Sequence, residues 1–245
     1  MELHDTRPRR LRPAGLALAL ALPALVAGVA APAEEEETME IRRAGAEADG
    51  METRMARARR SVARGDHDRA MATLDQVLEE VPGHAAARKL SARIHHEAGR
   101  EERALATLEA SLKTEAPDPE LVSLKARILL ESGRAGPALA ILDAHPRPLE
   151  SDADHHLLRA AALRQLGEHD AAREGYDALV RLHPDRGRAW AGLGLSLEAL
   201  GQRRDAAAAY ENAVSGDDPD AARFARQRLL GLPPADAAPE PEAEP

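Results

Sequence analysis

Five glycines recur at a constant spacing of 34 residues through most of this 245-residue chain, at Gly65, Gly99, Gly133, Gly167 and Gly201. Each glycine is followed five places later by an alanine, at Ala70, Ala104, Ala138, Ala172 and Ala206. Self-similarity at one fixed period is the sequence signature of a repeat array. Since the register has no insertions, we predict five consecutive units, over residues 51–84, 85–118, 119–152, 153–186 and 187–220.

Two further positions of each unit keep a constant side-chain size. The small position holds Ala58, Ala92, Ala126, Ala160 and Gly194, and the large position holds Leu74, Leu108, Leu142, Tyr176 and Tyr210. Apolar residues around them recur at spacings of three and four, which predicts helices. Small residues allow two helix backbones to approach closely, and large ones fill the space beside them. We therefore expect two packed helices per unit, joined at a glycine in the left-handed conformation.

Two units depart from this pattern. The third unit ends in Ala144-His145-Pro146-Arg147-Pro148, so its second helix is expected to be short. The first helix of the first unit is polar for a packed helix, and we interpret this unit as a frayed or capping one. It carries five arginines, at positions 54, 57, 59, 60 and 64.

The fifth unit has a characteristic order of residues: Trp190, Leu193-Gly194, Gly201, Ala206, Tyr210, Ala213 and Pro219. This order resembles the tetratricopeptide repeat, a helix–turn–helix unit of 34 residues. The resemblance implies an all-α fold, a right-handed α-solenoid of five such repeats. Phe224, Leu229 and Leu230 lie at helical spacing after the last repeat, so we expect a capping helix over residues 221–231.

The segment over residues 1–33 is typical of a signal peptide. Arginines at positions 7, 9, 10 and 12 precede an apolar run over residues 14–31, and Ala31-Pro32-Ala33 offers a cleavage site. Cleavage there predicts export, most simply to a bacterial periplasm. The alternative is a retained helix that anchors the protein in the inner membrane, although the run is short for a membrane span and Pro23 interrupts it.

Charge and composition indicate what the remaining segments are and which ligands are excluded. Residues 34–50 are expected to be an acidic spacer, and residues 232–245, rich in Pro, Ala and Glu, a disordered acidic tail. The net charge of −9 argues against nucleic-acid binding, and the lack of cysteine excludes disulfides and thiolate metal sites. We expect no cofactor and no metal, because the adjacent histidines of His95-His96 and His155-His156 point about 100° apart on a helix.

The resemblance also suggests a binding groove. In the tetratricopeptide-repeat family the first helices line a concave face, and by resemblance the ligand-facing places here hold Arg59, Lys89, Arg93, His96, Arg127 and Arg164. Because a guanidinium binds a carboxylate through two hydrogen bonds, we predict a groove for an acidic segment or C-terminal carboxylate of a protein partner. Two alternatives stay open. The cations pair with neighbouring glutamates such as Glu97 and Glu131, or the tail acids Glu240, Glu242 and Glu244 occupy the groove.

The sequence favours a non-catalytic scaffold over an enzyme. It contains neither a P-loop nor a G-x-S-x-G motif, so we predict a protein–protein interaction scaffold or assembly factor of the bacterial cell envelope. The alternatives are a membrane-tethered assembly or export factor with an uncleaved N-terminal helix, and a non-catalytic subunit of an envelope enzyme complex. An enzyme with a site hidden in the groove is a further alternative that no motif supports.

Overall fold

The computed structural model describes residue 39, residues 50–113 and residues 117–232. It divides into one unit over Met1–Ala48 and a second over Asp49–Pro245. The expectations for residues 1–33, for most of the spacer and for nearly all of the acidic tail therefore lie outside the described residues. Within the described part of the chain, no helix is both long enough and apolar enough to span a bilayer.

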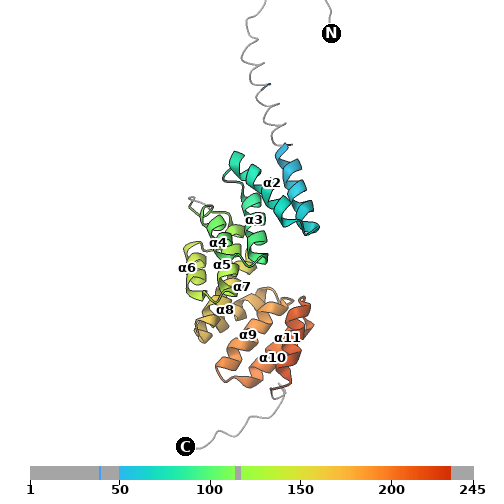
Figure 1. Ribbon diagram of the computed structural model, residues 1–245. Coiled ribbons are helices and arrows are strands. Elements are labelled where there is room, and N and C mark those ends of the chain that lie inside the picture. Colours follow the sequence, from blue (N-terminus) through green and yellow to red (C-terminus); the bar gives the residue numbers. More distant parts are fainter. Residues whose placement is uncertain (1–38, 40–49, 114–116, 233–245) are drawn as a thin grey trace, which may run out of the picture. The chain divides into compact units, whose positions relative to one another are not determined.

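The second unit consists of successive helix pairs, one pair for each predicted repeat (Figure 1). Helical residues 50–63 pair with α2, and an extra helix, α11, follows the fifth pair. The all-helical repeat fold expected from the sequence is confirmed over the described residues. The bounds are α2 (His67–Glu80), α3 (Ala85–Glu97), α4 (Glu101–Glu109), α5 (Pro119–Glu131), α6 (Ala135–Ala144), α7 (Ala153–Gln165), α8 (His169–Leu182), α9 (Gly187–Ala199), α10 (Arg203–Ser215) and α11 (Pro219–Leu229).

The five periodic glycines form the turns between the paired helices, as expected. Their φ angles lie between 69° and 82°, in the left-handed region. A Cβ added at any of them would meet nothing within 4 Å, so the backbone conformation and not crowding requires glycine there. In each turn the residue after the glycine donates its N–H to a carbonyl five residues back, as Asp66 does to Ser61 at 2.9 Å. This bond closes the end of the first helix in a Schellman-type turn.

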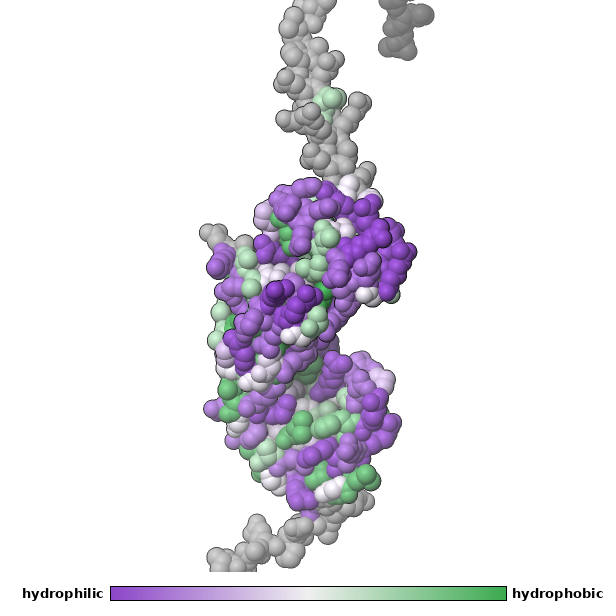
Figure 2. Space-filling model, viewed as in Figure 1, coloured by the Kyte–Doolittle hydropathy of each residue, from purple (hydrophilic) through white to green (hydrophobic). Residues whose placement is uncertain are grey.

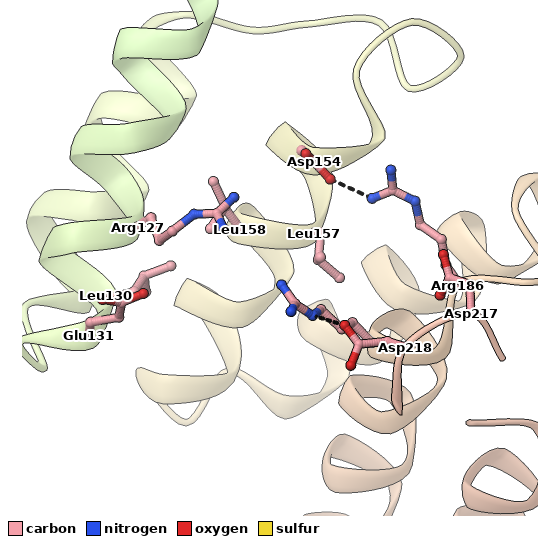
Figure 3. Close-up of a pocket in the computed structure, with 10 residues that line it drawn as sticks. Arg127, Leu130, Glu131, Asp154, Leu157, Leu158, Arg186, Asp217 and Asp218 are labelled. Atoms are coloured by element: carbon pink, nitrogen blue, oxygen red, sulfur yellow. Dashed lines mark hydrogen bonds and ion pairs between the residues drawn. The ribbon is translucent and has the colours of Figure 1, made fainter. Parts of the chain in front are cut away.

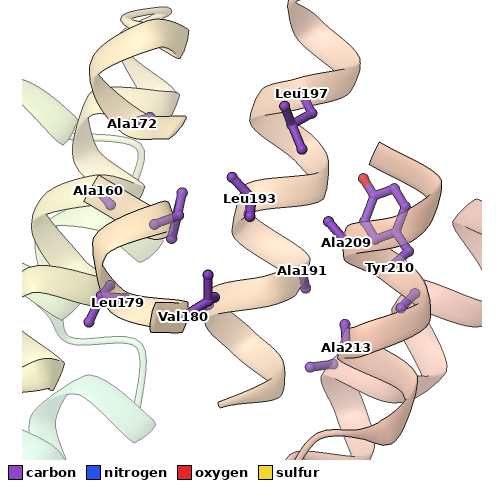
Figure 4. Packing of buried hydrophobic residues seen from close by; sticks show 14 of the residues in the cluster. Ala160, Ala172, Leu179, Val180, Ala191, Leu193, Leu197, Ala209, Tyr210 and Ala213 are labelled. Atoms are coloured by element: carbon purple, nitrogen blue, oxygen red, sulfur yellow. The ribbon is translucent and has the colours of Figure 1, made fainter. Parts of the chain in front are cut away.

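The core lies between the helices, where the small and large positions of each repeat meet. The five large residues are at most 2% exposed, and Ala58, Ala92, Ala126 and Ala160 are at most 1% exposed. Figure 4 shows this packing around α9, where Leu193 and Leu197 contact the same cluster as Leu179 and Tyr210. The alternation of size read from the sequence is therefore the packing pattern of the array.

Several helix ends differ from the expected ones. The second helix of the third repeat, α6, is short as predicted, but α4 is shorter still and ends at Glu109. Hydrogen bonds three residues apart, such as Ser111 N–H to the Leu108 carbonyl at 2.9 Å, tighten its last turn. The capping helix α11 begins at Pro219, two residues earlier than expected, because Asp218 caps it and proline is tolerated in a first helical turn. It packs against α10 and α9.

Candidate functional site

A groove of about 510 Å³ runs along the first helices of the second, third and fourth repeats. We call it the α3–α5 groove, and it brings together four of the six predicted site residues. Its lining comprises Lys89, Arg93, His96, Glu97, Pro119, Glu120, Ser123, Leu124, Arg127, Asp152 and Asp154. Helical spacing explains the gathering, because Lys89, Arg93 and His96 are separated by four and three residues and share one face of α3.

A second groove of about 390 Å³ continues the first along α5, α7 and α9 (Figure 3). We call it the α7–α9 groove. Arg127 and Asp154 line both grooves, so the two are adjoining parts of one surface. Leu130, Leu157 and Leu158 supply the apolar part of its lining, and the charged part comprises Arg127, Glu131, Asp154, Arg186, Arg188, Asp217 and Asp218.

Three of the four gathered side chains are paired with carboxylates. Lys89 pairs with Glu120, and His96 Nε2 lies 2.6 Å from Glu131 Oε2, so α3 is linked to α5 at two points. Arg93 lies 3.5 Å from Glu97 on its own helix. The pairing with neighbouring glutamates, left open as an alternative above, is thus found at these three residues. Such exposed pairs each contribute little to stability and can exchange for other partners.

Arg127 differs from these three side chains. It is exposed, it lies where the two grooves meet, and it makes no ion pair with any described residue. Figure 3 shows its side chain reaching from α5 toward Leu158 on α7, while on the other side of the view the guanidinium of Arg186 bonds Asp154. Arg127 is therefore available for a carboxylate from outside the described chain.

The α3–α5 groove carries charges of both signs. Lys89, Arg93 and Arg127 are matched there by Glu97, Glu120, Asp152 and Asp154. The stacked arginines therefore do not produce a uniformly basic surface. Figure 2 shows the same mixture more broadly, with hydrophilic residues dominating the early repeats in this view and more hydrophobic residues visible over the late ones.

Two predicted site residues line neither groove. Arg59 is exposed on the helix over residues 50–63. Arg164 is half-buried, and its guanidinium lies close enough to Tyr176 on α8 to lower the pKa of that hydroxyl, although burial has the larger effect and raises it. Arg164 therefore lies between the two helices of its own repeat, where its aliphatic stem packs while its charge meets the tyrosine.

Sequence reasoning missed the charged wall of the α7–α9 groove. Arg188 pairs with Asp218 at 2.5 Å, and Arg186 pairs with Asp154 at 2.6 Å. The Asp218 pKa is lowered, mainly by the backbone N–H of Ala221 and further by Arg188. Arg188 stands at a ligand-facing place of its repeat, so the family pattern could have found it. The loop over residues 216–218 could not be placed from a pattern, because it folds back until Asp217 accepts the Gly187 N–H at 3.0 Å.

The histidine pairs lie apart from the grooves, His96 excepted. His155 is 2% exposed, and burial lowers its pKa and that of the half-buried His95. The His155 and His156 ring centroids are 5.2 Å apart with the rings edge to face, so these two side chains pack against each other. Among the described residues, no three His, Cys, Asp or Glu side chains gather in a way that could hold a metal ion.

Stacked helix–turn–helix units with a groove along their first helices define an α-solenoid repeat protein. Family models described as "Tetratricopeptide repeat" match residues 61–128 and residues 153–196. These two segments are therefore identified as tetratricopeptide repeats, as the order of residues in the fifth repeat had indicated.

Solved structures of other repeat proteins share this fold. A segment of MamA from Desulfovibrio magneticus RS-1 has a TM-score of 0.60 at 18% identity, over 67% of this chain and 93% of that one. YrrB, described as a TPR protein with an unusual peptide-binding site, has a TM-score of 0.57 at 19% identity, over 71% of this chain and 90% of that one. A thermophilic TPR protein from Thermus thermophilus has a TM-score of 0.56 at 21% identity, over 74% of this chain and 99% of that one. A comparison with curated protein sequences gave no match.

Proposed function

We propose that this protein is a non-catalytic scaffold that holds a segment of a partner protein in the two adjoining grooves, with a partner carboxylate on Arg127. The tetratricopeptide-repeat fold supports binding of a protein or peptide partner. The observation that supports the position of the contact is the exposed guanidinium of Arg127 at the junction of the grooves, which pairs with no acid of the described part of the chain.

The lining of the grooves suits an extended segment of mixed character. Leu124, Leu157 and Leu158 offer apolar contacts on both sides of Arg127. A planar guanidinium binds a carboxylate through two parallel hydrogen bonds, so one acidic side chain or a terminal carboxylate would set the register of the segment. Further partner acids would have to displace Glu120 or Glu131 from Lys89 or His96. We therefore propose one dominant acidic contact with apolar residues beside it.

For its place in the cell, we propose export to a bacterial periplasm after removal of residues 1–33. The basic head, the apolar run and the Ala-Pro-Ala site support this proposal. N-terminal sequencing of the mature protein tests it: a start near residue 34 supports a periplasmic protein. An intact N-terminus would instead favour a membrane-tethered assembly or export factor.

The groove proposal is tested with a photo-crosslinking amino acid at Ser123, which lines the α3–α5 groove beside Arg127. Irradiation of cells captures the native partner, and its affinity for the purified full chain is then measured by calorimetry. We expect Arg127→Glu to weaken binding at least about tenfold, because loss of a charge-assisted bidentate contact costs about 1.5–3 kcal/mol.

Arg181→Glu is the matched control. Arg181 lies on α8 outside both grooves, its side chain is 75% exposed, and its reversal changes the net charge by the same amount. We expect this variant to bind as the natural chain does. Equal affinities for the Arg127→Glu and Arg181→Glu proteins would remove the proposed contact. Folding of both is checked by circular dichroism.

A further inference from the structure

Three arginines form one exposed stripe on the helix over residues 50–63 and the turn that ends it. Arg57, Arg60 and Arg64 are spaced by three and four residues, so they share one side of the helix. All three are exposed, and none pairs with a described acid. We call this stripe the arginine face. Its residues line neither groove, so it is a surface separate from the one proposed to hold a partner segment.

The later repeats show where this stripe points. The residues 68 and 102 places after Arg57 are Lys125 on α5 and Arg159 on α7. Lys125 pairs with Glu109 on α4, and Arg159 pairs with Asp143 on α6 at 2.7 Å. In both cases the cation meets an acid on the second helix of the preceding repeat. The arginine face of the first repeat is the same surface, and no described repeat precedes it.

The arginine face is poorly suited to a packed helix. At the place of Arg60 the four later repeats carry residues that are 0% exposed, namely Ile94, Ile128, Ala162 and Ser196. A helix packed in the same way on the first repeat would bury the Arg60 guanidinium, and desolvation of an unpaired charge is costly. Protein interfaces also need an apolar centre, which this stripe lacks. An anionic membrane surface, in contrast, attracts guanidinium groups and leaves them hydrated among headgroups.

The first repeat holds several cations that make no ion pair with a described residue. Five of its arginines make no ion pair with any described residue: Arg57, Arg59, Arg60, Arg64 and Arg69. Figure 2 shows strongly hydrophilic residues gathered over the first repeat in this view. A polar end would suffice for solubility, but solubility would not require three cations in one stripe on the helix.

The arginine face does not depend on the apolar run over residues 14–31, which the proposed cleavage removes. Clusters of exposed basic residues are themselves a recurrent means of contact with anionic lipids. We propose that the arginine face docks on an anionic membrane surface. Glu34–Glu37 lie between the run and the repeats and would be repelled by that surface, so the contact is confined to the arginine face and weakened by salt.

The experiment uses the full chain and its lack of cysteine, which makes a single introduced thiol unique. Ala63→Cys places a fluorescent dye beside Arg60 and Arg64, at an exposed helical residue. The protein is mixed with vesicles that contain a lipid-borne quencher and either phosphatidylglycerol or phosphatidylcholine. We expect the dye to be quenched by the phosphatidylglycerol vesicles alone, and to recover when the salt concentration is raised. The charge-reversal variant separates contact through the arginine face from attachment by the apolar run or by the basic residues before it, because these N-terminal residues are unchanged in it.

Charge reversal of Arg57, Arg60 and Arg64 together is expected to abolish this quenching. Each basic residue near an anionic surface strengthens binding about fivefold, the equivalent of about 1 kcal/mol, so three reversals weaken it by about 100-fold or more. A control protein carries the same charge change on exposed arginines far along the chain, at Arg181, Arg223 and Arg226. It should be quenched like the natural chain, and a dye at Ala199→Cys should not be quenched.

Two outcomes would overturn the proposal. In one, phosphatidylglycerol and phosphatidylcholine vesicles quench the dye equally, or the two triple variants behave alike. In the other, the dye responds to soluble poly-L-glutamate but not to vesicles, which would assign the face to an acidic protein. Neither outcome bears on Arg127, whose affinity for its partner is measured without lipid.

Discussion

At the scale of single residues, two tyrosines depend on two glycines of the facing helix. A Cβ at Gly192 would lie 2.3 Å from Cζ of Tyr176, and one at Gly194 would lie 2.6 Å from Cε1 of Tyr210. Both rings are at most 2% exposed. The first three repeats have leucine at the tyrosine place and alanine at the place of Gly194, and the fourth keeps Ala160 while its Tyr176 ring lies against Gly192. In the fifth repeat the larger Tyr210 ring is therefore matched by the loss of a methyl group at Gly194.

This match predicts the effect of Gly194→Ala. The new methyl group would overlap the buried Tyr210 ring, and we expect the free energy of unfolding to fall by about 1–3 kcal/mol. Urea unfolding followed by circular dichroism measures the change. Gly136→Ala is the control, since Gly136 is helical and has nothing within 4 Å of its would-be Cβ. It should leave stability unchanged or raise it by about 0.4–1 kcal/mol. Equal losses in both variants would contradict the argument.

At the scale of an element, α11 depends on Asp218 for both its start and its contact with α9. The carboxylate accepts the N–H groups of Asp220 and Ala221, each at 2.9 Å, and pairs with Arg188 across the α7–α9 groove. The side chain is 18% exposed, so these bonds are partly shielded from water. One residue thereby caps a helix and forms part of the groove wall.

Two substitutions at Asp218 separate these roles. Asp218→Ala removes the cap and the ion pair, and we expect a loss of about 0.5–2 kcal/mol together with faster hydrogen exchange in α11. Asp218→Asn keeps an oxygen that can accept the two N–H bonds and loses the charge, so it should cost only the ion pair, about 0.2–1 kcal/mol. If the two variants lose equal stability and exchange equally fast, the cap is not what holds α11.

At the scale of the whole molecule, buried histidines make stability depend on pH. Burial is the main cause that lowers the His95 and His155 pKa values. The charge of Asp75 raises the pKa of His95, and the charges of Arg100 and Arg103 lower it. The pKa of His155 is raised by Asp152 and lowered by His156, Arg147 and Arg159. In the unfolded chain both values return to about 6.5. Below that pH the unfolded state binds more protons than the folded state, so stability falls with falling pH; above it these groups have no effect.

We therefore expect a lower free energy of unfolding at pH 5.5 than at pH 7.5, measured by urea unfolding at constant ionic strength. His155→Leu should reduce the size of this fall, because its imidazole is the more buried of the two. Adding His95→Leu should reduce it again. A fall that is the same in the natural chain and in the double variant would show that other groups cause it. Both pH values lie above the ordinary pKa values of carboxylates, so Asp and Glu side chains contribute little to the change in stability between them.

The sequence by itself determined the helices, their turns and the packing between them. Each of these depends on contacts within a repeat or with the next one, so the same small, large and glycine positions recur every 34 residues and can be read without coordinates. Only the tertiary structure decided which of the candidate site side chains are paired with acids. Lys89 and His96 find acids 31 and 35 residues away on the next repeat, whereas Arg127 finds none among the described residues and Arg164 lies against Tyr176. Long flexible side chains can pair with several partners at nearly equal energy, so the repeat pattern does not predict which pair forms.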